Sequence, residues 1–197
     1  MAVLFISENK LKENSFINGN VDDKLIRATI IQVQDMQIHP IIGTGLYNQI
    51  KTQISGNTVS AANTTLLQEY IQPVIIWWVQ ADGTLPMTYK FMNKSVVKRN
   101  SENSNPADLD ELFAIADNFK NKAEFYTKRL IKFLEANETT YPLFTNPGDD
   151  VDTLHPYREA YQTGLNLDFD PIKPTSMKYN DSLNENNNFI DNYTYLL

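Results

Sequence analysis

The sequence contains no cysteine, which excludes disulfide bonds, thiolate chemistry and zinc–thiolate sites. No apolar run approaches the roughly eighteen residues that a membrane-spanning helix needs. The apolar opening, Ala2 to Ile6, is too short for a signal peptide and has no basic flank. We therefore expect no membrane contact and a protein of a reducing compartment, or of an assembly held together by packing alone.

The acidic excess is confined to one part of the chain. Residues 1–137 carry 14 basic and 14 acidic side chains, whereas residues 138–197 carry 3 basic and 10 acidic ones. The net charge of −7 therefore lies wholly in the last 60 residues. A general nucleic-acid binder needs a basic face, so the composition argues against that class.

What the sequence does contain is a long amphipathic helix, predicted over residues 105–137. Its apolar side chains recur in steps of three and four, which places them on a single stripe. Asn105 is predicted to cap the first turn, followed by Pro106, whose missing N–H does no harm there. A helix of this length with one apolar face needs other helices along it. Four members of the stripe are expected to face the core: Leu112, Phe119, Tyr126 and Phe133.

Two further helical regions precede it. The first begins at Asn20 or Asp22 and is ended or kinked at His39-Pro40, and residues 41–50 form either a second helix or a bent continuation of it. The second covers residues 64–81 and is apolar almost all round. Pro73 lies inside it, which predicts a kink and a carbonyl near Glu69 without its usual partner. These patterns predict an all-α fold, a small bundle with one long C-terminal helix.

The stretch between the second region and the long helix is less regular. Residues 86–92 are predicted as a short helix, and residues 93–104 as a loop or a short hairpin. This polar segment has a basic centre. Its side chains suit contact with DNA in a channel or with a carboxylate on a neighbour, and a solvated loop is an equal alternative. The basic residues are Lys94, Lys98 and Arg99.

After Asn137 the composition changes. The last 60 residues hold five of the nine prolines and nine of the 22 aromatic residues, with little helical periodicity. We divide the chain into a helical domain over residues 1–137 and an extended acidic arm over residues 138–197 that orders on a partner. The arm's predicted anchors are Phe144, Tyr157, Tyr161, Leu165 and Phe169.

Candidate chemistry is sparse. His39 and His155 are the only histidines, each before a proline, and a turn or capping role is favoured over a paired site. The acidic run 148–152 has carboxylates at alternate positions but lacks the glycine and distant glutamate of a calcium loop. No base lies at a meaningful spacing from Thr44 or Ser95. We therefore predict no enzymatic activity, no metal and no cofactor.

Four segments together carry a family resemblance. They are NGNVDDKLIRATIIQVQDMQIHPIIGTGLYNQI (18–50), IQPVIIWWV (71–79), KFMNKSVVKRNSENS (90–104) and AEFYTKRLIKFLEAN (123–137). The chain resembles the head–tail connector, or adaptor, ring proteins of tailed bacteriophages, particularly those of crAss-like phages. The resemblance covers residues 3–140, with a weaker echo at YREAYQTGL.

The resemblance implies a structural protein of the virion neck, assembled in the host cytoplasm. It implies a twelve-fold homo-oligomeric ring beneath the portal, with the portal and other neck or tail rings as partners. Viral DNA would pass through the channel without sequence-specific binding. Trp77 and Trp78 are predicted as core or as a subunit contact. Two alternatives remain, a small helical carboxylate- or metal-dependent enzyme and a monomeric helical adaptor of a bacterial cell.

Overall fold

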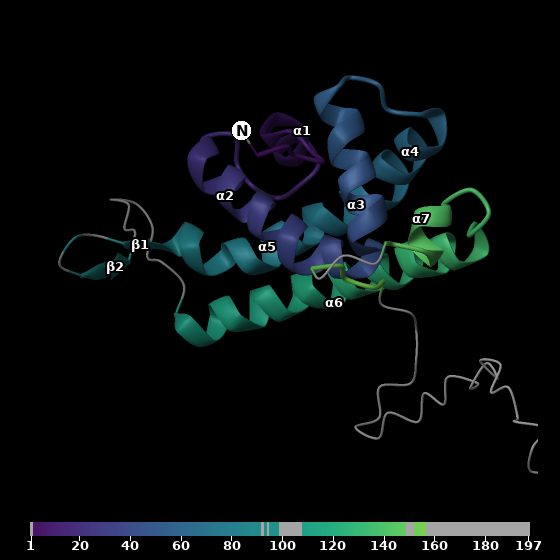
Figure 1. Ribbon diagram of the computed structural model, residues 1–197. Coiled ribbons are helices and arrows are strands. Elements are labelled where there is room, and N and C mark those ends of the chain that lie inside the picture. The colour runs from purple at the N-terminus through teal and green to yellow at the C-terminus, as the bar shows by residue number, and fades with distance from the viewer. Residues whose placement is uncertain (1, 92, 94, 99–107, 149–151, 157–197) are drawn as a thin grey trace, which may run out of the picture. The chain divides into compact units, whose positions relative to one another are not determined.

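The computed structural model describes residues 2–91, 93, 95–98, 108–148 and 152–156 (Figure 1). All of them belong to one compact unit, residues 1–159; a second unit, residues 160–197, lies outside the described part. The predicted all-α class is confirmed. The elements in chain order are α1 Glu8–Glu13, α2 Asp23–Val33, η1 Gln34–Ile38, α3 His39–Ser55, α4 Ala61–Thr65, η2 Leu66–Ile71, α5 Gln72–Thr88, β1 Tyr89–Phe91, β2 Val96–Lys98, α6 Leu109–Ala136 and α7 Pro142–Thr145, where η marks a π-helical turn.

The long helix α6 begins and ends at strong capping signals. Asp108 and Glu111 form a capping box: the Asp108 side chain accepts from a first-turn N–H, and Glu111 accepts from the Asp108 N–H at 3.1 Å. The predicted cap at Asn105 is therefore wrong, and residues 105 and 106 lie outside the described part. The C-terminal end agrees with prediction, since Asn137 is the C-cap. No helix among the described residues is long and apolar enough to cross a membrane.

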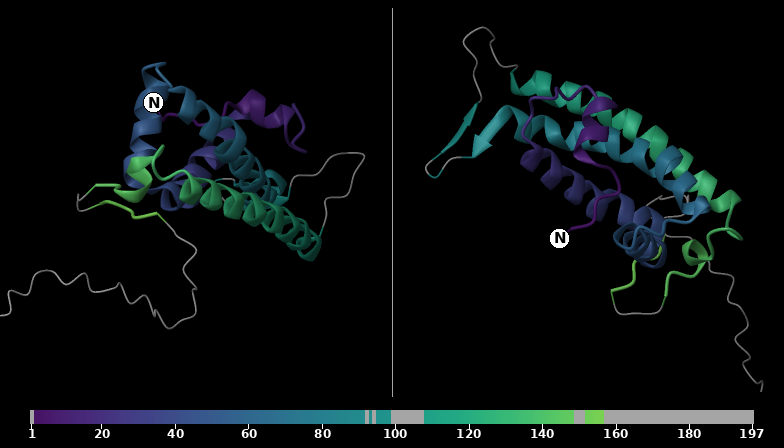
Figure 2. Two further views of the ribbon diagram at one scale, coloured as in Figure 1. Left: turned by 90° about the vertical axis from the view of Figure 1, so that its right-hand side faces the viewer. Right: turned by 90° about the horizontal axis from the view of Figure 1, so that it is seen from above.

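Helices α5 and α6 lie side by side in opposite directions (Figures 1 and 2). The antiparallel hairpin β1–β2 follows α5, with Tyr89 opposite Lys98 and Phe91 opposite Val96. The hairpin alternative for residues 93–104 is thus confirmed over residues 96–98. The predicted short helix over residues 86–92 is wrong, because α5 continues past Gly83 and Pro86 to Thr88.

Two of the helix prolines, Pro40 and Pro73, follow a π-helical turn, whereas Pro86 lies in the last part of α5 without one. Turn η1 precedes Pro40, and η2 precedes Pro73. Because Pro73 has no N–H, the carbonyl of Glu69 loses its usual helical partner. Nη1 of Arg129 on α6 lies 3.5 Å from that carbonyl and donates to it. The carbonyl that was predicted to lack its helical partner therefore accepts a hydrogen bond from α6 and links η2 to that helix.

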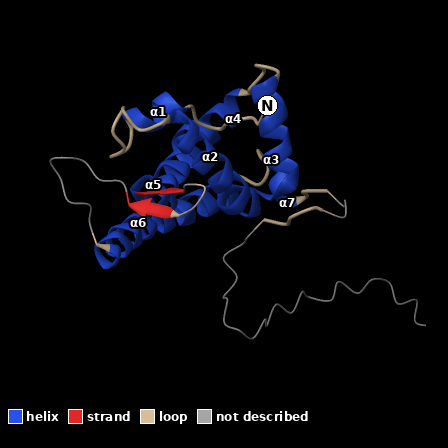
Figure 3. Ribbon diagram, turned by 90° about the vertical axis from the view of Figure 1, so that its left-hand side faces the viewer, coloured by secondary structure: helices blue, strands red, loops and turns tan. Residues whose placement is uncertain are grey.

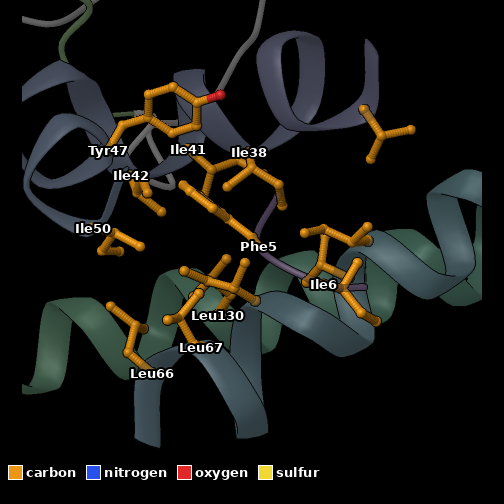
Figure 4. Close-up of a cluster of buried hydrophobic side chains, with 14 of the residues drawn as sticks. Phe5, Ile6, Ile38, Ile41, Ile42, Tyr47, Ile50, Leu66, Leu67 and Leu130 are labelled. Atoms are coloured by element: carbon orange, nitrogen blue, oxygen red, sulfur yellow. The ribbon is translucent and has the colours of Figure 1, made fainter. Parts of the chain in front are cut away.

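The core lies where α2, α3, η2 and α5 meet the second half of α6 (Figure 4). On α6 the predicted burial of Leu112 is confirmed, and the rest of the buried line runs through smaller side chains than predicted, among them Ala123, Leu130 and Leu134. The predicted inward aromatics Phe119, Tyr126 and Phe133 are only half-buried, because they stand on the flank of this line.

The N-terminal residues enter this core as an extended segment. Phe5 and Ile6 are buried among side chains of α3, η2 and α6 (Figure 4). Two buried glutamines hold the backbone. Gln34 accepts from the Phe5 N–H at 2.8 Å and donates to the Val3 carbonyl at 3.0 Å. Gln72 donates to the Phe5 carbonyl at 2.8 Å. The segment is therefore part of the domain rather than a loose leader.

Candidate interaction surface

The hairpin, drawn red in Figure 3, lies at one end of the molecule. The helix ends and strands there expose large apolar side chains. We call this surface the open end: the last turn of α5, the hairpin and the first turns of α6. Val96 is 56% exposed although its side chain is β-branched and apolar. An isolated two-stranded hairpin is marginally stable in water, so this end gains stability when covered. Its exposed apolar members are Leu85, Val96, Val97, Leu109 and Phe113.

A groove lies in the middle of this surface. It has a volume of about 410 Å³, within the range of pockets that accept a small molecule or a few side chains. Its lining comes from α5, both strands of the hairpin and α6, so it depends on the position of the hairpin beside the start of α6. The lining residues are Leu85, Pro86, Tyr89, Val96 and Leu109.

Acidic side chains stand at the start of α6 beside this groove. The Asp108 side chain is 91% exposed, and its Oδ1 lies 3.7 Å from Nζ of Lys98. Asp110 and Glu111 are exposed in the first turn. They stabilise the positive end of the helix dipole and leave an acidic rim on an apolar surface.

The two tryptophans join α5 to α6 within the subunit. Trp78 is half-buried, and its indole N–H donates to Oγ1 of Thr127 at 3.2 Å. Trp77 stacks on Tyr126 with ring centroids 6.3 Å apart and also meets Phe119. The ammonium of Lys122 lies 4.8 Å from the Trp77 ring. Their predicted role as core is thus partly met, and a contact with another subunit stays a prediction.

A second pocket lies between the segment that joins α1 to α2, residues 14–22, and the second half of α5. It has a volume of about 270 Å³, and Phe16 and Phe119 stack at its edge with centroids 6.1 Å apart. The buried Gln80 accepts from the Phe16 N–H at 3.0 Å, which fixes the segment there. On α5, Asp82 is half-buried, and this desolvation raises the pKa of its carboxyl against the opposing effect of Lys120.

The opposite end of the molecule is closed by a strap, residues 146–148 and 152–156. Helix α3 breaks at Gly43, where φ is +78°, and this break exposes the N–H and hydroxyl of Thr44. The Thr44 N–H donates to the Leu154 carbonyl at 3.0 Å, and the Leu154 N–H donates to Oγ1 of Thr44 at 2.8 Å. A Cβ on Gly43 would lie 2.8 Å from Pro156, and one on Gly45 2.7 Å from the Pro147 carbonyl oxygen. The glycines permit this close approach.

His39 lies beneath the strap. Its Nε2 is 2.9 Å from Oγ1 of Thr44, and its ring stacks on Tyr47 with centroids 4.4 Å apart. Because the Thr44 hydroxyl accepts from Leu154, its own proton is free to reach Nε2 of neutral His39. Desolvation lowers the pKa of His39, Asp35 opposes this, and Lys51 adds to it.

Tyr47, on which His39 stacks, is buried beside the same carboxylate. Its hydroxyl donates to Oδ1 of Asp35 at 2.6 Å. Desolvation and this hydrogen bond raise the pKa of the phenol. His155 is exposed on the strap. The two histidines therefore occupy different environments. The contact of His39 that bears on the strap is its hydrogen bond with Thr44, five residues later in HPIIGT, and sequence reasoning did not single out this pair.

The helical domain extends beyond Asn137. Tyr141 and Phe144 lie after Asn137 yet are buried in the main core, and the Tyr141 hydroxyl donates to the Ala62 carbonyl at 2.9 Å. This burial raises the pKa of the Tyr141 phenol. A boundary after Asn137 is thus wrong, because the helical domain needs these side chains. Phe144 is an anchor within the subunit rather than one for a partner.

Several predicted site residues lie outside the described part of the chain. They include two of the three basic residues of the hairpin region and four of the arm anchors: Lys94, Arg99, Tyr157, Tyr161, Leu165 and Phe169. Lys98 is described and faces Asp108. Asp149 and Asp150 of the acidic run are also outside it. Among the described residues, no three histidine or acidic side chains are grouped to hold a metal ion.

Fold and surface together define a helical-bundle protein with one closed end and one open, apolar end. Residues 38–153 match the family DUF6712, a family of unknown function, and the chain belongs to this family. The matched range spans α3, the hairpin, α6 and the start of the strap, so it includes both ends. No curated protein and no solved structure matches the chain.

Proposed function

We propose that the protein is a structural subunit of the virion neck, a head–tail connector that forms a ring beneath the portal. The observation that carries this proposal is the open end. A subunit that leaves several large apolar side chains around a groove exposed is suited to permanent contact with other protein surfaces. The choice of a head–tail connector among possible assemblies comes from the resemblance of four segments to phage adaptor proteins.

The arrangement of the ends supports the same proposal. The chain reaches the strap last among the described residues, and the strap is fixed at the end of the bundle that carries α3 and α7 (Figure 1). Among the described residues, the closed end is thus covered by the strap, while the open end leaves apolar side chains exposed to a neighbour.

The test is assembly. The purified chain is examined by size-exclusion chromatography with light scattering and by electron microscopy, alone and with the portal protein of the same virus. A closed ring, or incorporation into a portal complex, supports the connector. A chain that stays monomeric and does not bind the portal excludes it and leaves the bacterial adaptor, and stoichiometric divalent metal in the purified protein favours the enzyme.

A further inference from the structure

A second exposed feature of the subunit is complementary to the open end in chemistry, an apolar ring among basic side chains. Phe125, in the second half of α6, is 65% exposed, with its ring against Tyr126 at 5.4 Å between centroids. A phenylalanine so exposed on a helix buries little surface within its own subunit. We call Phe125 and the lysines around it the knob.

The charge around the knob is mainly basic: residues 121–132 carry three lysines and Arg129 against one acidic residue, Glu124. Lys122 and Lys128 stand three residues before and after Phe125, and Lys132 stands two turns beyond it on the same outer face. All three are exposed. At the open end, the groove is apolar and its rim carries Asp108, Asp110 and Glu111.

The knob cannot reach the groove of its own subunit. Leu109 lines the groove and Phe125 forms the knob, and both belong to the same continuous helix. Sixteen residues of helix separate them by about 24 Å. A contact between the two features therefore requires a second copy of the chain.

We propose that the groove at the open end accepts Phe125 of a second copy of this chain, with the lysines of the knob against the acidic rim. The proposal rests on the proposed function, since it names the contact between neighbouring subunits. The apolar groove would bury the phenyl ring, and the opposite charges would fix its register.

Such a contact joins different surfaces of two identical subunits. A heterologous contact leaves one free knob and one free groove on every dimer, so it repeats until the rotation closes a ring. A two-fold pairing, in which each knob enters the groove of the other copy, would instead use up both features and stop at the dimer. The ring of the proposed function therefore requires the head-to-tail arrangement, in which each subunit's knob enters the groove of a different neighbour.

The test uses two single variants of the full chain, Phe125→Glu and Val96→Glu. Each removes one half of the contact, and each should weaken self-association by at least about 30-fold, as loss of a central anchor does. Mixed in equal amounts, they still have one intact groove and one intact knob. The mixture should therefore form a 1:1 dimer and nothing larger, measured by analytical ultracentrifugation.

Met36→Glu is the matched control, because Met36 is also exposed and lies on η1, away from both features. It should assemble as the unchanged chain does, and circular dichroism should show all three variants folded. Unchanged assembly of Phe125→Glu overturns the proposal, as does a mixture that stays monomeric. A wild-type chain that never self-associates but still binds the portal overturns this contact and leaves the connector function standing.

Discussion

The two ends of the molecule treat apolar side chains in opposite ways. At the closed end, Phe144 is fully buried, and the strap approaches α3 so closely that glycine is required. At the open end, Phe113 and Val96 remain about half exposed around a groove. Among the described residues, the closed end therefore buries its apolar side chains within one chain, whereas the open end leaves several of its own exposed. Substitutions at the closed end should therefore change the free energy of unfolding, and substitutions at the open end should mainly change association.

The strongest test of this difference compares two phenylalanines. Phe144→Ala should cost about 3–5 kcal/mol in the free energy of unfolding, because it empties a fully buried site. Phe113→Ala should cost less than about 1 kcal/mol in the isolated subunit, since half of its ring already faces water. Urea unfolding followed by circular dichroism measures both. Equal losses would mean that the two ends do not differ as described.

The sequence predicted the helical class, the length of α6 to within a few residues at its start, and the loss of a helical partner at Glu69. Periodicity and proline chemistry are local, so they can be read from one segment. It did not predict that Phe144 belongs to the core. After Asn137 the chain has no repeating pattern, and its burial depends on contact with α3 and α4, far away in sequence.

The same limit applies to the candidate surface. An exposed valine and a buried valine look alike in sequence, so Val96 gave no sign that it lines a groove. The spacing of α6 predicts Leu112 and three aromatic residues on the inward face. Leu112 is buried, but Phe119 and Tyr126 are only half-buried and meet Trp77 of α5, while Ala123 and Leu130 take the buried positions.

A second test concerns the polar clamp on the N-terminal segment. Gln34→Met should cost about 2–4 kcal/mol, because the Phe5 N–H and the Val3 carbonyl lose their partner in a buried setting. Gln72→Met should cost less, since it orphans only the Phe5 carbonyl and removes a side-chain oxygen, Oε1, that is buried without a partner. Thermal unfolding of both variants measures the difference. A larger loss of stability in Gln72→Met than in Gln34→Met would contradict this account of how the glutamines hold the N-terminal segment.

A third test concerns the glycine that admits the strap. Gly43→Ala should cost about 1–3 kcal/mol, because the backbone there has a positive φ and the new Cβ would meet Pro156. Gly19→Ala is the control, since a Cβ at Gly19 meets nothing within 4 Å. Hydrogen exchange should show faster exchange of the Leu154 amide in Gly43→Ala alone. Unchanged protection would mean that the strap does not depend on this close approach.

The smallest expected effect is the response of the closed end to pH. Folding lowers the pKa of His39, so the unfolded chain binds a proton there more readily than the folded chain does. The stability that neutral His39 contributes is therefore full above its ordinary pKa of about 6.5 and is lost as the pH falls below that value. The strap should weaken first, because a protonated ring can no longer accept from the Thr44 hydroxyl. Solvent screens this half-buried site, which keeps the loss below about 1 kcal/mol.

Urea unfolding at pH 7.5 and pH 5.5 should show that loss in the unchanged chain and a smaller one in His39→Gln. His155→Gln, altered at the exposed strap histidine, should behave as the unchanged chain. If His39→Gln loses as much stability as the unchanged chain, the response arises elsewhere and the link from His39 to the strap is structural only.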